Sequence, residues 1–181
     1  MSCASASGDG LYVAIARDHE LSLYTVEPFA EIARTSLEPG TERTVVFVGR
    51  QVLVHEPTRI GVYALPRLSV TAKVELGRRT RLHATSSHYA LLVRDGEALV
   101  VACTSEGAAL APTRTPAHVD RAVGLEVARF LIWPKQGPAE IWDAVTRLPV
   151  ARIGLELPPD ASAVGATAKH RSVWITTRGG E

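Results

Sequence analysis

The chain is poor in cysteine, in lysine and in long hydrophobic runs. Its two cysteines, Cys3 and Cys103, lie far apart and have no Cys or His at metal-ligand spacing, which argues against a disulfide framework and a zinc motif. The first ten residues, MSCASASGDG, contain neither a basic nor an apolar segment of the signal-peptide type. Every apolar run is far shorter than a membrane span. We therefore expect free thiols, no bound metal or cofactor, and a cytoplasmic protein that does not bind membranes.

The chain also lacks an excess of positive or negative charge. The 181 residues contain 20 basic and 19 acidic side chains, so the net charge is +1. This balance gives no general attraction to nucleic acid or to anionic lipid. A hydrophobic content of 46% with 22% charged residues is typical of a globular chain. The length predicts a single domain over residues 1–181.

The sequence does contain a repeat. Short apolar runs of similar character recur about every 40 residues, a period typical of stacked four-stranded sheets when no helix lies inside it. The runs are LYVAIA from Leu11, QVLVHE from Gln51, YALLV from Tyr89, RFLIW from Arg129 and SVWIT from Ser172. A second series follows the first four after short polar turns, of which Asp95-Gly96 is a strong hairpin signal.

Alternating apolar and polar residues within the runs predict strands, and Pro and Gly recur too often for a sizeable helix. Each repeat divides into four strands. The predicted units cover residues 1–36, 43–76, 81–115, 118–156 and, as a partial unit, 161–181. The predicted strands are 2–6, 11–16, 20–26, 29–35, 44–48, 51–55, 59–65, 68–75, 81–85, 88–94, 97–103, 108–114, 119–125, 129–134, 139–145, 148–155, 162–167 and 172–177.

The fourth unit carries a motif. Trp142-Asp143 ends its third strand, and Ala117-His118 precedes its first strand. With these residues the chain resembles the WD-repeat family, in which Gly-His opens a unit and Trp-Asp closes it. The equivalent pairs in the other units are degenerate: they read Tyr24-Thr25, Tyr63-Ala64 and Val101-Ala102.

The resemblance implies an all-β, β-propeller-like fold with about four and a half four-stranded blades, that is, a partial or open propeller. It also implies a structural role for His118, Trp142 and Asp143. In the family this His takes part in a hydrogen-bond network that reaches the Trp. Trp133 or a neighbour stands where a Ser or Thr would complete that network, so we expect it to be incomplete.

No stretch predicts catalysis. There is no nucleophile elbow, no phosphate-binding glycine loop and no HExxH motif. His55-Glu56, His83 and His88 are scattered over separate strands, and we expect them to be ordinary hydrogen-bonded side chains. His118 and Asp120 could form a metal or acid–base pair, but a structural role is the better interpretation.

Basic residues gather in loops that a propeller would present on one face. GRRTR at 77–81 is the densest cluster, and Arg43 falls in an equivalent loop. Such a face could bind an acidic protein surface or peptide, whereas solvated loop charge is the simpler alternative. The candidate partner-binding residues are Arg78, Arg79, Arg81, Arg114, Arg121 and Lys135.

These features predict a non-enzymatic protein–protein interaction scaffold, a partial propeller that another chain completes or docks on. The expected first strands of the units (VVFVG, LHATS, AVGL, AVGAT) are small and apolar, which disfavours the alternatives of a propeller-based enzyme fragment or a small-ligand sensor domain. The fifth unit has only two strands, so its edge strand and the outer face of the first unit would expose apolar groups. We expect the missing strands to come from a second chain, from a symmetry-related copy in a homo-oligomer, or from the remainder of a longer protein.

Overall fold

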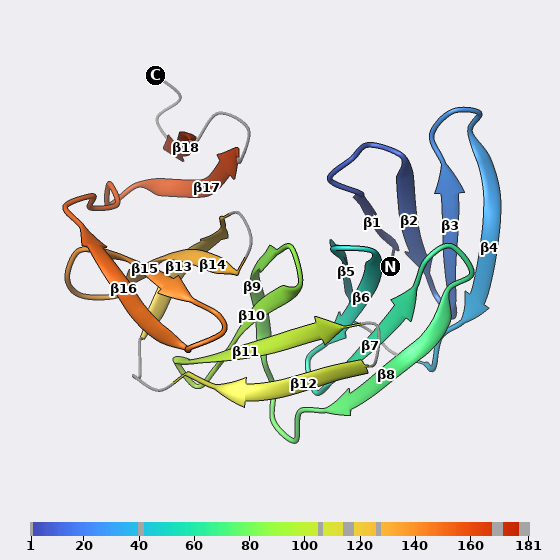
Figure 1. The fold of residues 1–181 in the computed structure, drawn as a ribbon, viewed down its shortest axis with the longest axis horizontal. Coiled ribbons are helices and arrows are strands. Elements are labelled where there is room, and N and C mark those ends of the chain that lie inside the picture. Colours follow the sequence, from blue (N-terminus) through green and yellow to red (C-terminus); the bar gives the residue numbers. More distant parts are fainter. Residues whose placement is uncertain are drawn as a thin grey trace. The chain divides into compact units, whose positions relative to one another are not determined.

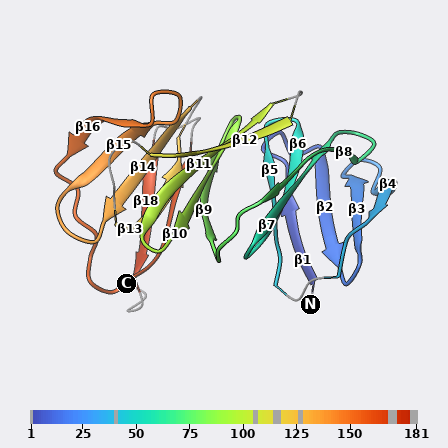
Figure 2. The same cartoon turned by 90° about the horizontal axis from the view of Figure 1, so that it is seen from below.

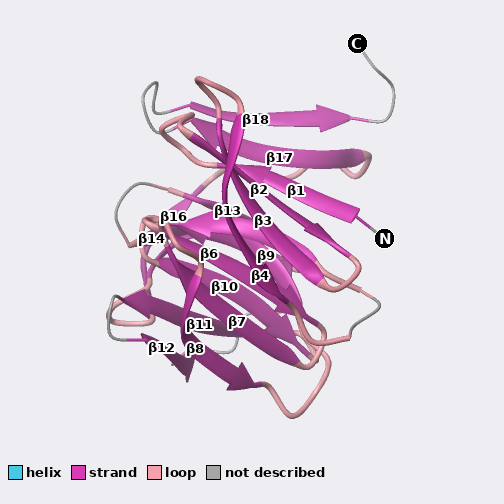
Figure 3. Ribbon diagram, turned by 90° about the vertical axis from the view of Figure 1, so that its right-hand side faces the viewer, coloured by secondary structure: helices cyan, strands magenta, loops and turns pink. Residues whose placement is uncertain are grey.

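The computed structural model describes residues 2–39, 42–104, 107–113, 118–125, 128–167 and 172–177. These residues form strands, turns and loops, and none of the described residues is helical (Figure 3). The prediction of an all-β chain is therefore confirmed.

Four sheets have four antiparallel strands each, and a fifth sheet has two (Figure 1). Within every sheet, strands that follow one another in the sequence lie side by side. The first sheet is β1 (Ser2–Ala6), β2 (Tyr12–Arg17), β3 (Glu20–Thr25) and β4 (Ala30–Ser36); the second is β5 (Thr44–Val48), β6 (Gln51–Glu56), β7 (Arg59–Ala64) and β8 (Ser69–Glu75). The third is β9 (Arg81–Ser86), β10 (Tyr89–Arg94), β11 (Glu97–Thr104) and β12 (Gly107–Pro112); the fourth is β13 (Val119–Gly124), β14 (Arg129–Pro134), β15 (Ala139–Asp143) and β16 (Leu148–Ile153). The terminal sheet is β17 (Ala161–Thr167) with β18 (Ser172–Thr177).

The observed strands lie where the repeat predicts them, and their ends differ from the predicted ends by two residues or fewer. The hairpin between β10 and β11 is closed by Asp95 and Gly96, which have φ angles of 53° and 87°. These left-handed values suit Asp and Gly, which explains why this dipeptide predicts the turn.

The strands group into two compact units. The first comprises residues 1–82 with 102–110, and the second comprises 83–101 with 111–181. The first unit includes most of β12, whereas β10 belongs to the second. Figure 2 shows the strands from a second direction.

The first unit has its core between the first and second sheets. Leu21 and Leu23 of β3 point toward the second sheet, where Val52 and Val54 of β6 meet them. The period of two along each strand places these side chains on one face. Each fully buried Leu or Val contributes about 1.5–3 kcal/mol to the free energy of folding.

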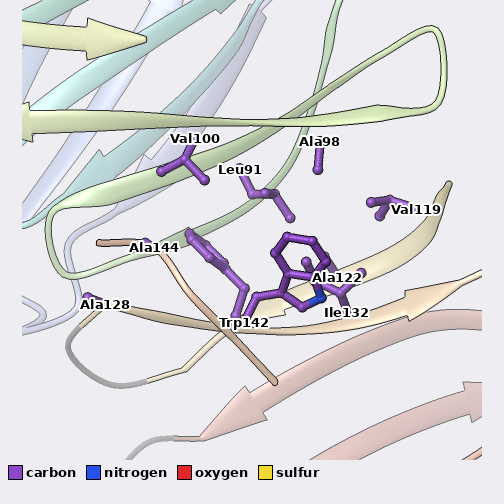
Figure 4. Packing of buried hydrophobic residues seen from close by; sticks show 10 residues of the cluster. Leu91, Ala98, Val100, Val119, Ala122, Ala128, Ile132, Trp142 and Ala144 are labelled. Atoms are coloured by element: carbon purple, nitrogen blue, oxygen red, sulfur yellow. The ribbon is translucent and has the colours of Figure 1, made fainter. Parts of the chain in front are cut away.

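The second unit is built around β14, which is buried on both faces. Phe130 and Ile132 join the core cluster on one face, whereas Leu131 and Trp133 join a separate cluster on the other. The first cluster also contains Trp142, which is 2% exposed and packs among residues from four other strands, β10, β11, β13 and β14 (Figure 4). The burial of Trp142 agrees with the structural role that the resemblance implies for it.

Both cysteines are free. Cys103 is buried and its surroundings raise the pKa of its thiol to about 12 by desolvation, whereas Cys3 is only partly buried. In the part of the chain that the structure describes, there is no helix long and apolar enough to cross a membrane.

Candidate functional site

The candidate basic residues fall into two groups, one in each compact unit. Arg78 and Arg79 follow β8, and Arg81 begins β9. Arg121 lies on β13, and Lys135 lies in the turn after β14. Arg114 lies outside the described residues.

The group in the first unit is already engaged in local contacts. Arg79 Nη2 lies 2.6 Å from Glu42 Oε2, and both side chains are well exposed. Arg78 also has an interaction partner. Exposed ion pairs of this kind exchange readily with other partners because each contributes at most about 1 kcal/mol.

The group in the second unit shares a concavity. Arg121 and Lys135 both line a groove of about 770 Å³, which we call the Trp133 groove. Its lining residues are Asp120, Arg121, Trp133, Pro134, Lys135, Gly137, Glu156, Leu157, Pro158, Pro159, Asp160 and Ala161.

A β-bulge in β13 shapes one side of the Trp133 groove. Val119 pairs with Pro134 and Arg121 pairs with Trp133, so Asp120 is an extra residue in β13. A bulge redirects the side chains around it and ends regular pairing. Here it allows two successive residues, Asp120 and Arg121, to line the same groove.

The groove is lined by side chains of both charges. Asp120, Arg121 and Lys135 belong to β13 and to the turn after β14, whereas Glu156 and Asp160 belong to the segment between β16 and β17. Arg121 Nη1 donates to the carbonyl oxygen of Asp120 at 3.1 Å and lies 3.9 Å from its Oδ1. Within the described residues, no ion pair engages Lys135.

Trp133 is the most buried residue that lines the groove. It is 2% exposed, and its Nε1 has no hydrogen-bond partner among the described residues. A buried donor without a partner costs about 1–3 kcal/mol, so such groups are rare in folded proteins.

The motif residues have structural contacts. Trp142 Nε1 donates to Glu140 Oε2 at 3.0 Å. Asp143 Oδ1 accepts from the amides of Val145 at 3.0 Å and Thr146 at 2.8 Å, and from the Thr146 hydroxyl at 3.1 Å. The Thr146 amide and hydroxyl, with the Val145 amide, lower the pKa of Asp143 below its ordinary value. Asp143 thus stabilises the turn that leads into β16.

His118 is not joined to Trp142 by any hydrogen bond within the described residues. It is exposed, and its Nδ1 lies 2.6 Å from the position that a Cβ on Gly96 would occupy. The His118 imidazole therefore lies against the β10–β11 hairpin, and it fits there because Gly96 has no side chain. The described residues contain no cluster of His, Cys, Asp and Glu that could hold a metal ion, at Asp120 or elsewhere.

Arg43 was expected on the basic face, and this expectation is wrong. Its side chain is 7% exposed, and its Nε lies 2.7 Å from Glu56 Oε1. Arg59 pairs with the second oxygen of Glu56. Burial would raise the pKa of Glu56, but the hydrogen bonds from Arg59 and Arg43 outweigh burial and lower it. The pattern of charged residues in the sequence does not indicate that the side chain of Arg43 is buried.

His55 lies beside this ion-pair network and is buried. Its Nε2 lies 2.9 Å from the Thr80 hydroxyl, so it is an ordinary hydrogen-bonded side chain, as expected. Desolvation lowers the pKa of His55 to about 4 despite the nearby Glu42 and Glu56. The imidazole is therefore neutral at pH 7.

The terminal sheet offers a second surface. Val164 and Ala166 of β17 pack against the fourth sheet, whereas Trp174 of β18 lies over Gly165 and is 48% exposed. A Cβ at position 165 would collide with this indole, so glycine is required there. β18 pairs with β17 and with no other strand among the described residues, and its sequence SVWITT is uncharged.

No protein-family model matches the chain, and no curated protein matches its sequence. Solved structures do match. The chain is similar to the β-propeller domain of Cps50 (Swd1) from Myceliophteria thermophila, with a TM-score of 0.68 and 13% identity over 97% of this chain and 62% of that one. It is also similar to the WD40 domain of SCAP from fission yeast, with a TM-score of 0.67 and 13% identity over 91% of this chain and 44% of that one. Apo AztD from Citrobacter koseri gives a TM-score of 0.58 and 15% identity over 85% of this chain and 46% of that one.

The chain has a β-propeller fold. Its similar structures include a WD40 domain and another β-propeller domain, and each four-stranded sheet of the chain corresponds to one blade of such a fold. The chain spans less than two-thirds of the length of these propellers, at 62% and 44%. In the sequence, four sheets of four strands are followed by the two described strands of the terminal sheet.

Proposed function

We propose that this propeller is a non-enzymatic protein-interaction scaffold that binds another protein chain along β18. The observation that carries the proposal is the contrast between the terminal sheet and the blades. Every blade has four strands, whereas the terminal sheet has two among the described residues, and its edge strand β18 carries a half-exposed Trp174.

Edge strands present unpaired amide and carbonyl groups, and proteins normally protect them with charge, proline or a covering segment. β18 lacks the protective residue types, since its sequence SVWITT contains neither a charged residue nor a proline. Extended segments of partner proteins bind such edges by adding strands, and exposed tryptophans are frequent centres of binding energy in interfaces. A partner that adds strands to β18 would pair its backbone groups and cover Trp174.

A photo-crosslinker tests this proposal. Thr176→p-benzoylphenylalanine places the reactive group on exposed β18 and leaves Trp174 intact, whereas Arg67→p-benzoylphenylalanine places it in the exposed β7–β8 turn as a control. Irradiation of cells that produce the two variants should give a discrete heavier adduct with another protein at position 176 alone. Absence of an adduct at 176, or the same adducts at both positions, contradicts the proposal.

The basic residues after β8 form a separate contact for an acidic partner in this proposal. The exposed Arg79–Glu42 pair can exchange Glu42 for an acidic group of the partner. Arg78→Ala combined with Arg79→Ala should weaken binding of an acidic partner protein without lowering the melting temperature, since surface substitutions rarely change stability by more than about 0.5 kcal/mol. Arg67→Ala is the matched control. Unchanged binding in the double variant assigns Arg78 and Arg79 to ordinary surface charge.

A further inference from the structure

We infer that a pocket beside Thr80 in the first unit binds one carboxylate side chain of an acidic partner protein, with Arg81 as the cation that pairs with it. The inference rests on the proposed function in taking an acidic protein as the partner of the basic residues after β8. It adds to that contact a defined pocket and a single charge.

The pocket, which we call the Thr80 pocket, has a volume of about 320 Å³. All of its lining residues belong to the first compact unit. They are Glu42, Thr44, His55, Pro57, Arg79, Thr80, Arg81 and Leu82. Ligand pockets usually measure about 300–1,000 Å³, so this pocket suits one side chain better than a large ligand.

Buried hydrogen bonds hold Thr80 in place between two arginines. Thr80 is 3% exposed, and its amide donates to the carbonyl oxygen of Pro57 at 2.6 Å. Its hydroxyl donates to the same carbonyl oxygen at 3.3 Å and lies 2.9 Å from His55 Nε2. Because the backbone is fixed at Thr80, the positions of Arg79 and Arg81 in the chain are set before a ligand arrives, which lowers the entropic cost of binding.

The charges that line the Thr80 pocket are not balanced. Arg79 and Glu42 form an ion pair with each other, at 2.6 Å between Nη2 and Oε2. His55 adds no charge at pH 7, because desolvation lowers its pKa to about 4. Within the described residues, Arg81 has no hydrogen bond or ion pair. Its positive charge is therefore the one that a ligand can neutralise.

A single carboxylate fits this surplus. A guanidinium group has five N–H donors in a planar arrangement that matches the two oxygens of a carboxylate, and the hydrogen bonds between them are strengthened by charge. Because Glu42 already balances Arg79, one negative charge neutralises the pocket, whereas a doubly charged phosphate would exceed it. The partly buried Pro57 and Leu82 exclude water from part of the wall, and an ion pair is stronger where water is excluded.

The test uses the full chain labelled with nitrogen-15, and a capped pentapeptide, acetyl-Ala-Ser-Glu-Ser-Ala-amide, as the probe. In proton–nitrogen correlation spectra, the amide resonances of Thr80 and Arg81 should shift with the probe and reach a plateau. The Trp174 resonances on β18 should stay in place. The analogue with Gln in place of Glu should bind about tenfold more weakly, as expected for the loss of a charged acceptor.

Two variants of lining residues should change binding in opposite directions. Arg81→Gln should weaken binding of the probe about tenfold, because it removes the unbalanced cation. Glu42→Gln should strengthen it, because Arg79 is then also free to pair with the probe. Arg67→Gln and Glu27→Gln are the matched controls: they remove the same charges from exposed turns outside the pocket and should leave the dissociation constant unchanged. Circular dichroism spectra like that of the wild type show that these surface variants retain the fold.

Four results would overturn the inference: no shift with the Glu probe, equal binding of the Glu and Gln probes, wild-type binding by Arg81→Gln, or the same shifts with sodium acetate at equal concentration. Acetate binding would assign the pocket to small carboxylates. Tighter binding of a phosphoserine analogue than of the Glu probe would assign it to phosphate, which also contradicts the inference. The crosslink from position 176 on β18 depends on none of these results, so failure of the Thr80 pocket is distinguishable from failure of the proposed function.

Discussion

Replacing Trp142 with alanine is the most informative test of the packing between blades. Trp142 is 2% exposed and belongs to the core cluster that includes Leu91, Phe130 and Ile132. Burying a tryptophan side chain removes about 200 Å² of its surface from water, which stabilises the folded state by about 5 kcal/mol at 25 cal/mol per Å². Partial collapse of the site reduces this cost, so Trp142→Ala should lower the free energy of unfolding by about 3–5 kcal/mol. Loss of its bond to Glu140 adds little, because Arg152 also pairs with that carboxylate.

The matched control is Trp174→Ala, which makes the same chemical change at a residue that is 48% exposed. With half of its surface already in water, Trp174→Ala should cost about 2 kcal/mol or less. Urea unfolding at constant pH, followed by far-ultraviolet circular dichroism, measures both values, and an unchanged slope shows that stability alone has changed. A Trp142→Ala variant no less stable than Trp174→Ala would refute the assignment of Trp142 to the core.

Three further predictions concern buried polar groups. Arg43→Met should destabilise the chain by about 3 kcal/mol in urea unfolding, because it leaves the buried Glu56 with one cation fewer, whereas the exposed Lys73→Met should have little effect. Burial lowers the pKa of His55 in the folded state from 6.5 to about 4, so on acidification the unfolded state binds the proton first. The free energy of unfolding should therefore fall as the pH drops from about 6.5 to 4, and the His55→Gln variant should lack this component of the pH dependence. Iodoacetamide at pH 8 should alkylate Cys3 before Cys103, whose buried thiol has a pKa of about 12, and comparable labelling rates would contradict that burial.

The strands could be predicted from the sequence because each one carries a local signal. β-branched and aromatic residues alternate with polar ones, and turn residues such as Asp95-Gly96 separate the runs. The ends of β15 and β16 were predicted two residues too long. β15 ends at Asp143 because its carboxylate binds the following turn amides, a contact that the hydrophobic pattern does not reveal.

The candidate site could be predicted only in part. Positive charge in or next to the loops was enough to select Arg121, near the start of β13, and Lys135, and both line the same groove. The groove itself depends on the bulge at Asp120 and on Trp133, whose missing hydrogen-bond partner is a property of the packed fold. Arg43 shows the converse: its loop position suggests exposure, but a carboxylate from β6 holds it inside.

The central claim, that another protein binds this propeller along β18, is tested most directly by sedimentation. The labelled wild-type chain, mixed with fresh extract from the cells of origin, should sediment in a complex heavier than 19.4 kDa, while the purified chain alone sediments as a 19.4-kDa monomer. Trp174→Asp, which places a charge on the half-exposed face beside the open edge, should shift the chain in the extract to the monomer position and retain an all-β circular dichroism spectrum. A wild-type chain that sediments as a monomer in the extract, or a Trp174→Asp variant that stays in the heavier complex, would contradict the account.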